Sequence, residues 1–265
     1  MKKIIAIALS ATMTVGIMNV PAYAELTGFK GIGQISVKAA TEELTYGDFK
    51  YVVENGGVTI KEYTGTDSAV TIPDMINGKK VLEIGKLAFY NNENLESLYI
   101  TKNIKKVGDG AFEFCQELKK VIFINNSDTS YDVILENNAF EWCNKLEEVK
   151  LSQNVKEIGW TAFEFCSNLK EIKLSKNLEY LGYGVFRGTG VTSITIPKAL
   201  KRVEEGALSG AKYLKEVIFE DGMEEIPALI LYVDKNINNQ IEKVKIPSSV
   251  KKIGREAFKN CAGLS

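Results

Sequence analysis

The chain has 265 residues, 45% of them hydrophobic, and carries 33 basic and 34 acidic residues for a net charge of −1. It has no basic excess and no basic block, so nucleic acid and anionic membranes are not expected as partners. Histidine is absent, which excludes Ser-His-Asp and Cys-His catalysis and histidine-ligated metal sites.

The first segment, Met1–Ala24, has the pattern of a secretory signal peptide. Lys2-Lys3 is followed by an apolar run and by Ala22-Tyr23-Ala24, which forms a small-x-small cleavage signal. A membrane anchor is the alternative, but the run is barely long enough to span, contains polar residues and stops at Pro21. We therefore predict cleavage after Ala24, and a protein that is secreted or held at the cell surface without membrane insertion.

Residues 25–45 show no sustained period and are interpreted as a linker or lead-in. Phe49–Ile60 then alternates on both sides of Glu54-Asn55-Gly56-Gly57, which predicts a β-hairpin whose Asn and Gly supply positive φ angles. Such a hairpin would cap the open end of a stack of coils. Residues 46–94 are thus interpreted as an N-terminal cap with the first repeat.

Residues 95–265 repeat one short unit, seen best in Leu146–Leu169. Successive units open 23, 28, 23, 22, 23, 27 and 23 residues apart. The openings are at Leu95, Leu118, Leu146, Leu169, Val191, Leu214, Ile241 and Leu264. A unit this short cannot bury its own apolar side chains, so it must stack on its neighbours. A step in the low twenties is typical of leucine-rich repeats.

Within the unit, Val149 and Leu151 alternate like a half-buried strand. Gly159 is interpreted as the residue that permits a sharp change of direction. The Ala-Phe pair that follows, Ala162-Phe163, is spaced with Cys166 like the inward stripe of a short helical turn. Phe163 is therefore a predicted core residue.

The two long steps are interpreted as insertions into a constant coil. Asn125–Asn138 is predicted to form a longer outer strand or a loop. The unit from Leu214 lacks the Ala-Phe-x-x-Cys segment, and its run Ile226–Gln240 is predicted to form a short helix or strand over the core. The last residues open another unit at Leu264, so we expect a longer array or a multidomain protein.

Ile241–Cys261 fits the pattern L-x-x-I-x-I-P-x-x-V-x-x-I-G-x-x-A-F-x-x-C nearly position for position. This pattern resembles the BspA-like (type 5) leucine-rich repeat family of bacterial surface proteins, and the resemblance covers Tyr46–Leu264. It implies a repeat solenoid of the horseshoe type. The solenoid would be β-rich, with one parallel concave sheet, short outer strands, short helical turns and the N-terminal hairpin cap.

The resemblance also implies a non-catalytic, adhesin-like module that binds a protein or glycan at the bacterial surface, without a cofactor. The motif specifies the fold well and the ligand poorly. Two alternatives stay open: a targeting array for an enzyme domain beyond Ser265, and a structural surface spacer. The oligomeric state is not predicted.

Alternation along the strands predicts two outward columns of side chains on the concave face. The candidate binding residues there are Tyr99, Lys120, Ile122, Glu148, Lys150, Glu171, Lys173 and Thr195. Like charges lie on adjacent strands in these columns and are relieved diagonally by their opposites. Such a face is either a soluble surface or one with charge complementarity to a partner.

An aromatic flank is the second candidate site. Phe114, Trp142 and Phe165 occupy the position before cysteine in three consecutive units, with Trp160 and Tyr183 one turn away. These rings either pack between coils, as buried aromatic side chains usually do, or form an exposed apolar stripe that marks a contact site.

Two further columns are interpreted as structural. The four cysteines, Cys115, Cys143, Cys166 and Cys261, share one position of the repeat. Three lie in neighbouring units and one lies four units on, so they cannot form two bridges between adjacent coils. We predict a buried ladder of free thiols rather than a metal site.

A column of carboxylates follows the Ala-Phe pair at Glu113, Glu141 and Glu164. It is interpreted as a solvated outer edge with nearby lysines. Cation binding or acid–base chemistry is the alternative, but Ca²⁺ needs six or more convergent oxygens and no supporting loop motif is present.

Overall fold

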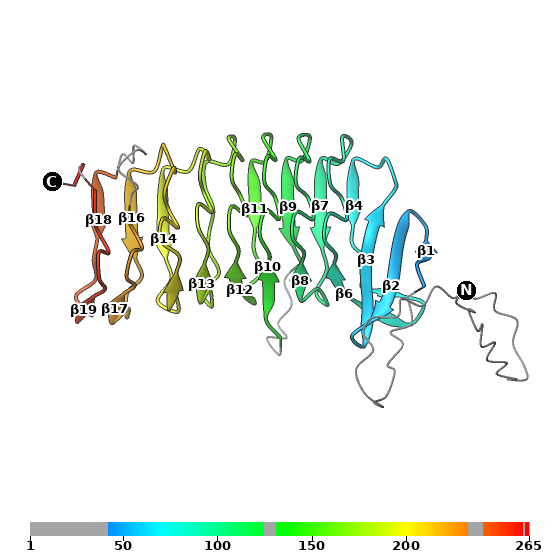
Figure 1. Ribbon diagram of the computed structural model, residues 1–265, viewed down its shortest axis with the longest axis horizontal. Helices are drawn as coiled ribbons and strands as arrows, with labels where there is room; N and C mark the ends of the chain where they lie inside the picture. Colours follow the sequence, from blue (N-terminus) through cyan, green and yellow to red (C-terminus); the bar gives the residue numbers. More distant parts are fainter. Residues whose placement is uncertain (1–41, 125–130, 233–240, 262, 265) are drawn as a thin grey trace, which may run out of the picture. The chain divides into compact units, whose positions relative to one another are not determined.

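The computed structural model describes residues 42–124, 131–232, 241–261 and 263–264. The unit Glu42–Ser265 is a β-solenoid whose coils follow one another in chain order (Figure 1). The predicted signal peptide and most of the predicted linker lie outside the described residues, as does part of each predicted insertion.

The N-terminal hairpin is confirmed. β2 (Phe49–Glu54) pairs antiparallel with β3 (Gly57–Tyr63), and Glu54 lies opposite Gly57. The two turn residues, Asn55 and Gly56, have φ angles of 51° and 80°, as a tight two-residue hairpin turn requires. A short strand, β1 (Leu44–Tyr46), pairs with the outer edge of β2. The other edge, β3, pairs in parallel with β6 (Lys79–Ile84) and so begins the stack.

One face of the solenoid carries the strands that open each coil. Four of them pair in parallel: β4 (Ala69–Thr71), β7 (Ser97–Ile100), β9 (Lys120–Phe123) and β11 (Glu148–Lys150). Three more form a separate sheet: β14 (Ser193–Ile196), β16 (Glu216–Phe219) and β18 (Lys243–Lys245). We call these two sheets the strand face. The single sheet expected here is therefore interrupted between β11 and β14.

The short outer strands form the longer sheet of the molecule. It continues from β6 through β8 (Lys106–Val107), β10 (Val133–Leu135), β12 (Val155–Ile158), β13 (Tyr180–Leu181) and β15 (Arg202–Val203). β5 (Met75–Ile76) pairs antiparallel with β6. β17 (Glu225–Ile226) and β19 (Lys252–Ile253) pair as a further short sheet.

The expected short helical turns are wrong, because the described residues contain no helix. Each Ala-Phe pair lies instead in hydrogen-bonded turns flanked by two residues of positive φ. Gly110 (φ 60°) and Phe114 (φ 61°) bound one such segment, and Thr161 (φ 53°) and Phe165 (φ 59°) bound another. A left-handed residue every few positions breaks the run of right-handed angles that a helix needs.

The repeat glycine serves a different purpose from the one expected. Gly159 has no positive φ, but a Cβ added to it would lie 2.7 Å from the backbone nitrogen of Asn137. Gly108 and Gly182 show the same close approach to the preceding coil. The glycine is therefore required because two coils pass in near contact, and not because the chain bends there.

The core is a column of stacked rings. Phe89, Phe112, Phe140, Phe163 and Phe186 are all at most 2% exposed. Successive ring centroids lie 4.7, 5.2, 5.4 and 6.1 Å apart. Each ring thus packs on the ring of the next coil, which confirms the inward stripe and shows why no unit could be stable alone.

The cysteine column is a ladder of free thiols, buried at three positions and half-buried at Cys261. Each thiol donates to a backbone carbonyl of the preceding coil. The Sγ atom of Cys143 lies 3.2 Å from the oxygen of Phe112, and that of Cys166 lies 3.1 Å from the oxygen of Phe140. The thiols are second donors to these carbonyls, because the oxygens of Phe112 and Phe140 also accept from the backbone nitrogens of Cys115 and Cys143.

The unit after Leu214 does keep the turn that appeared to be missing. Leu229 has a φ of 63° and donates from its backbone nitrogen to Arg255, as the corresponding residues of other coils do to their neighbours. Ile230 and Leu231 are fully buried in the place of the Ala-Phe pair. Ile226 ends the short strand β17, but the expected helix or strand is wrong for Pro227–Tyr232, where an aliphatic pair replaces the Ala-Phe pair.

Candidate functional site

The two outward columns of the strand face have the predicted register. On one side of the interruption, Lys120 lies opposite Glu148, and Ile122 lies opposite Lys150. On the other side, Thr195 lies opposite Ile218. The other candidate residues of this face continue the same columns. Tyr99 is partnered with Ile122, and Lys173 is joined to Lys150 by an isolated bridge.

Most charges on the strand face are neutralised within it. Glu148 pairs with Lys150 of its own strand and with Lys120 at 3.2 Å. Hydrogen bonds from these two lysines, Lys150 first, hold the pKa of Glu148 below its ordinary value. Glu216 is paired in the same way with Lys245 at 2.9 Å and Lys243 at 3.4 Å. The expected compensation of like charges is thus present on both sheets.

The interruption of the strand face falls at Lys170–Leu174, which we call the break coil. A groove of about 450 Å³ opens between the break coil and β14. We call it the break groove. The polar side chains along it are those of Lys170, Lys173, Lys176, Thr192, Ser193 and Thr195. Within the described residues none of these three lysines forms an ion pair, in contrast to those of β9, β11 and β18.

The aromatic flank is a second stack, parallel to that of the core. The ring centroids of Phe114 and Trp142 lie 5.9 Å apart, and those of Trp142 and Phe165 lie 4.1 Å apart. Tyr90 meets Phe114 edge-on at 5.8 Å. A Cβ at Gly188 would lie 2.6 Å from the ring of Phe165, so the backbone there covers the last ring. The faces of these rings therefore pack against one another between coils, and this flank is better described as inter-coil packing than as an open contact stripe.

Trp160 and Tyr183 do not belong to that stack. Trp160 is 49% exposed and its indole nitrogen donates to the hydroxyl of Tyr180 at 3.0 Å. That hydroxyl donates in turn to Glu204 at 3.1 Å, and Arg202 lies over the Tyr180 ring. Tyr183 packs over Gly206. Of the two predicted residues, Trp160 is the one that presents a large aromatic surface to solvent.

The carboxylate column is less solvated than expected, and the cation beside Glu164 is an arginine. The side chain of Glu164 is 8% exposed and lies 3.4 Å from Nε of Arg187, which holds the same position in the next coil. Burial, followed by repulsion from Glu164 and Glu113, raises the pKa of Glu141 to about 7, and Trp142 acts in the opposite direction. The interpretation as a solvated edge with lysines is therefore wrong at Glu141 and Glu164, whereas at Glu113 a lysine, Lys86, acts to lower the pKa that burial and Asp109 raise.

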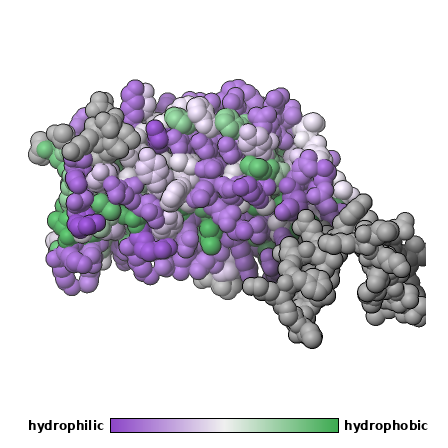
Figure 2. Space-filling view, in the orientation of Figure 1, coloured by the Kyte–Doolittle hydropathy of each residue, from purple (hydrophilic) through white to green (hydrophobic). Residues whose placement is uncertain are grey.

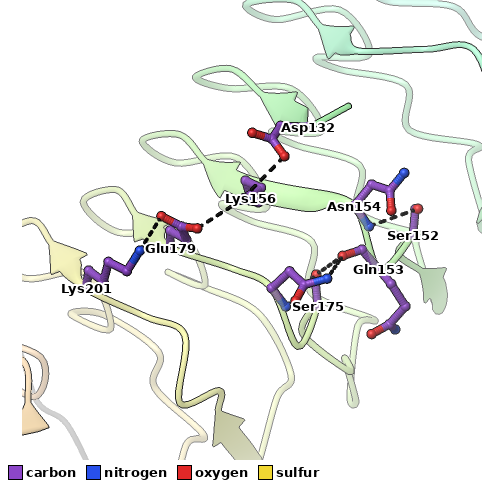
Figure 3. A network of polar contacts seen from close by, with 9 residues as sticks. Asp132, Ser152, Gln153, Asn154, Lys156, Ser175, Glu179 and Lys201 are labelled. Atoms are coloured by element: carbon purple, nitrogen blue, oxygen red, sulfur yellow. Dashed lines mark hydrogen bonds and ion pairs between the residues drawn. The ribbon is translucent and has the colours of Figure 1, made fainter. Parts of the chain in front are cut away.

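The longer sheet carries a chain of ion pairs. Lys156 lies between Asp132 at 3.4 Å and Glu179 at 3.0 Å, and Glu179 also pairs with Lys201 at 2.9 Å (Figure 3). The positive and negative side chains of this row are thus paired with one another along the stack. The view of the molecule in Figure 2 is accordingly largely hydrophilic, and hydrophobic side chains gather mainly at the end that holds β18 and β19.

Across the described ranges, no three acidic, cysteine or histidine side chains come together closely enough to hold a metal ion. The part of the chain that the structure describes also contains no helix of the length and apolarity needed to cross a membrane.

Several residues of the break groove were not among the predicted site residues. Lys170, Lys176, Thr192 and Pro197 line it together with the predicted Glu171, Lys173 and Thr195. Two sequence signals pointed to this place: the one step of 22 residues in the array, and a proline directly after the strand. The proline does not by itself indicate a groove, because Pro247 holds the same register position after β18, which still pairs with β16.

The family model of the BspA type leucine rich repeat region matches the chain in six copies, over residues 55–134 and 133–265. The chain belongs to this family. It shares the solenoid built from such repeats. No match was found among curated proteins.

Two solved structures share the fold of this BspA-type chain. A leucine-rich repeat protein of T. pallidum is 21% identical, with a TM-score of 0.56, over 84% of this chain and 91% of the other. A leucine-rich cell surface protein of Faecalibacterium prausnitzii is also 21% identical, with a TM-score of 0.57, over 85% of this chain and 76% of the other. At this identity the likeness concerns the fold.

Proposed function

We propose that this chain is an exported, non-catalytic repeat module that binds a protein or a glycan at the bacterial surface, as an adhesin does. The register of the strand face carries the proposal. Coils hold their outward side chains at fixed positions about 4.8 Å apart, on a backbone fixed by parallel pairing. A rigid surface with variable side chains binds a ligand without reorganising.

Family and fold support the location as well as the function. The F. prausnitzii protein that shares the fold is described as a cell surface protein. The pattern of Met1–Ala24 is that of a signal peptide. We propose that the mature protein begins at Glu25, and the N-terminal sequence of protein recovered outside expressing cells tests this. Recovery inside the cells with Met1 retained would contradict export.

Binding is tested with the fluorescently labelled chain on preparations of bacterial surface, host extracellular matrix and immobilised glycans. Saturable binding to at least one of them is expected. A structural spacer would show no saturable binding to any. A variant that carries Lys150→Ser and Lys173→Ser changes the strand face and is expected to weaken the binding.

A matched control removes the same charge from the other side of the solenoid. Lys251→Ser with Lys252→Ser alters two exposed lysines at β19, each of which pairs with a glutamate of the preceding coil. This control is expected to bind like the unchanged chain. Equal losses in both variants would show that binding follows net charge rather than the strand face.

A further inference from the structure

The interruption of the strand face has a cause in the length of one turn. From the cysteine position to the residue that opens the next coil, the chain takes three residues in most coils, as from Cys166 to Leu169. From Thr189 to Val191 it takes two. Gly190 fills the shortened turn, and a Cβ on it would lie 2.9 Å from the carbonyl oxygen of Ser167. The chain therefore enters β14 by a tighter path than it enters the other strands.

A proline removes a hydrogen bond at the other end of the same strand. The residue after β9, Ile124, donates from its nitrogen to Ile100 at 2.8 Å, and Glu220 after β16 donates to Ile196 at 3.0 Å. Pro197 holds this position after β14 and has no N–H to donate. Within the described ranges, no backbone hydrogen bond joins the break coil to β14.

The break coil is held from its other side. An isolated bridge joins Lys173 to Lys150 of β11. Beyond the coil, the Ser175 hydroxyl donates to the carbonyl of Gln153 at 2.9 Å (Figure 3). The side-chain amide of Asn177 donates to the same carbonyl, also at 2.9 Å. Its edge towards β14 lies along the break groove and, within the described residues, makes no backbone hydrogen bond across it. Such an edge is a template for an extended chain.

The side chains around this edge favour a ligand that carries negative charge. Lys170, Lys173 and Lys176 form no ion pair within the described residues, and the hydroxyls of Thr192, Ser193 and Thr195 lie along the other wall. Two carboxylates also line the groove, Glu171 of the break coil itself and Glu220. One of them, Glu220, already accepts a hydrogen bond from the backbone of Lys198 at 3.0 Å. The groove thus has three ammonium groups and two carboxylates.

We propose that the break groove binds an extended acidic peptide segment of a partner protein, which pairs its main chain with the break coil and places carboxylates against the three lysines. This inference rests on the proposed binding function and names its ligand. A peptide satisfies both features of the groove, because a polysaccharide has no backbone amides to continue the ladder. The break coil has five residues, so the bound segment is about 17 Å long at roughly 3.3 Å per residue.

Main-chain pairing is tested on the unchanged full chain. The probe is a fluorescein-labelled hexapeptide of alternating glutamate and threonine, and its partner is the same peptide with every backbone nitrogen methylated. Fluorescence anisotropy should show that methylation weakens binding by about tenfold or more, the loss expected when a few hydrogen bonds are removed. Equal binding of the two peptides, or no binding of either, would overturn the inference.

Charge selection is tested with two triple variants whose folding is checked by thermal melting. Lys170→Ser, Lys173→Ser and Lys176→Ser should weaken hexapeptide binding by about tenfold or more. The control, Lys251→Ser, Lys252→Ser and Lys259→Ser, removes equal charge from lysines already paired with glutamates away from the strand face and should change binding by less than about threefold.

Three results would count against the peptide. Equal losses in both triple variants would indicate nonspecific attraction. Tighter binding of a sulfated polysaccharide, lost in the groove variant, would assign the groove to a glycan. A chain that keeps saturable binding to surface preparations but ignores the hexapeptide would overturn this inference and leave the proposed function standing.

Discussion

The rings of Trp142 and Phe165 stack with their centroids 4.1 Å apart, and both residues have left-handed backbones with φ angles of 61° and 59°. Bulky residues rarely adopt such angles, which cost about 1–2 kcal/mol. Other coils place asparagine or glycine here, as at Asn91 and Gly188. Stacking between neighbouring coils thus offsets a backbone conformation that each residue alone disfavours.

Replacing Trp142 separates these two effects. Trp142→Ala should destabilise the fold by about 2–4 kcal/mol, because it loses the ring contacts on both sides and keeps the unfavourable φ. Trp142→Asn should cost about 1 kcal/mol less, because asparagine tolerates the left-handed region. Denaturant unfolding of both variants measures the difference, with the exposed Trp160→Asn as control. Equal losses for alanine and asparagine would contradict the role given to φ.

The core stack is tested at Phe163, which lies between the rings of Phe140 and Phe186. Phe163→Ala should lower the free energy of unfolding by about 3–5 kcal/mol, through lost transfer free energy and a cavity shared by adjacent coils. The exposed Tyr213→Ala serves as control and should stay within about 1 kcal/mol of the unchanged chain. A loss below about 1 kcal/mol at Phe163 would mean that the ring is not part of the core.

Stability should depend on pH through Glu141. Its pKa is raised from 4.5 to about 7 in the folded state, so the folded state favours the protonated carboxyl. The stabilisation from the raised pKa is complete below pH 4.5 and is lost as the pH rises through 7.

The variant Glu141→Gln, which has no proton to lose, should therefore be more stable than the unchanged chain at pH 8 by about 1 kcal/mol, a value reduced for partial exposure. At pH 4.5 the two should be equal. Thermal melts of both proteins across this range give the difference in stability. Both proteins contain Glu148 and Glu216, whose pKa values are lowered, so the contributions of these two groups cancel in the difference. A constant difference at all pH values would exclude titration of Glu141 as the cause.

Close approach of coils is tested at Gly159. Gly159→Ala should destabilise by about 1–3 kcal/mol, because the added methyl meets backbone atoms of residues 136 and 137 that cannot move aside. Gly47→Ala is the matched control for a glycine of positive φ in open space, and it should cost about 1 kcal/mol. If Gly159→Ala proved harmless in unfolding experiments, the spacing of the coils would have to be wider than described.

The thiol ladder predicts a specific reactivity. Unfolded without reductant, the chain should show four titratable thiols. In the folded state Cys261 should react first, since it is half-buried, whereas burial raises the pKa of Cys115 and Cys143 well above the ordinary value. Thiol titration before and after unfolding, with the labelled residue identified by mass spectrometry, checks both statements. Two or no titratable thiols after unfolding would contradict the ladder.

Much of this fold follows from residues that act within one coil or between directly adjacent coils. The spacing of Ala162-Phe163 and its copies predicted the stack, and Asn55-Gly56 predicted the hairpin turn. Alternation along each strand predicted the columns of the strand face, including Lys120 opposite Glu148. These predictions succeed because a strand's period and a turn's φ angles depend on local residues alone.

The distance between coils was decided by the tertiary structure. The need for glycine at position 159 becomes clear only beside the backbone of the neighbouring coil. The left-handed backbone of Trp142 is likewise understood only together with its stacking on the ring of Phe165. The burial of Glu164 beside Arg187 likewise follows from how two coils meet. The break groove is the clearest case. A turn one residue short is an ordinary feature of a sequence, and only the structure shows that no backbone hydrogen bond joins Lys170–Leu174 to β14 and that a groove opens there.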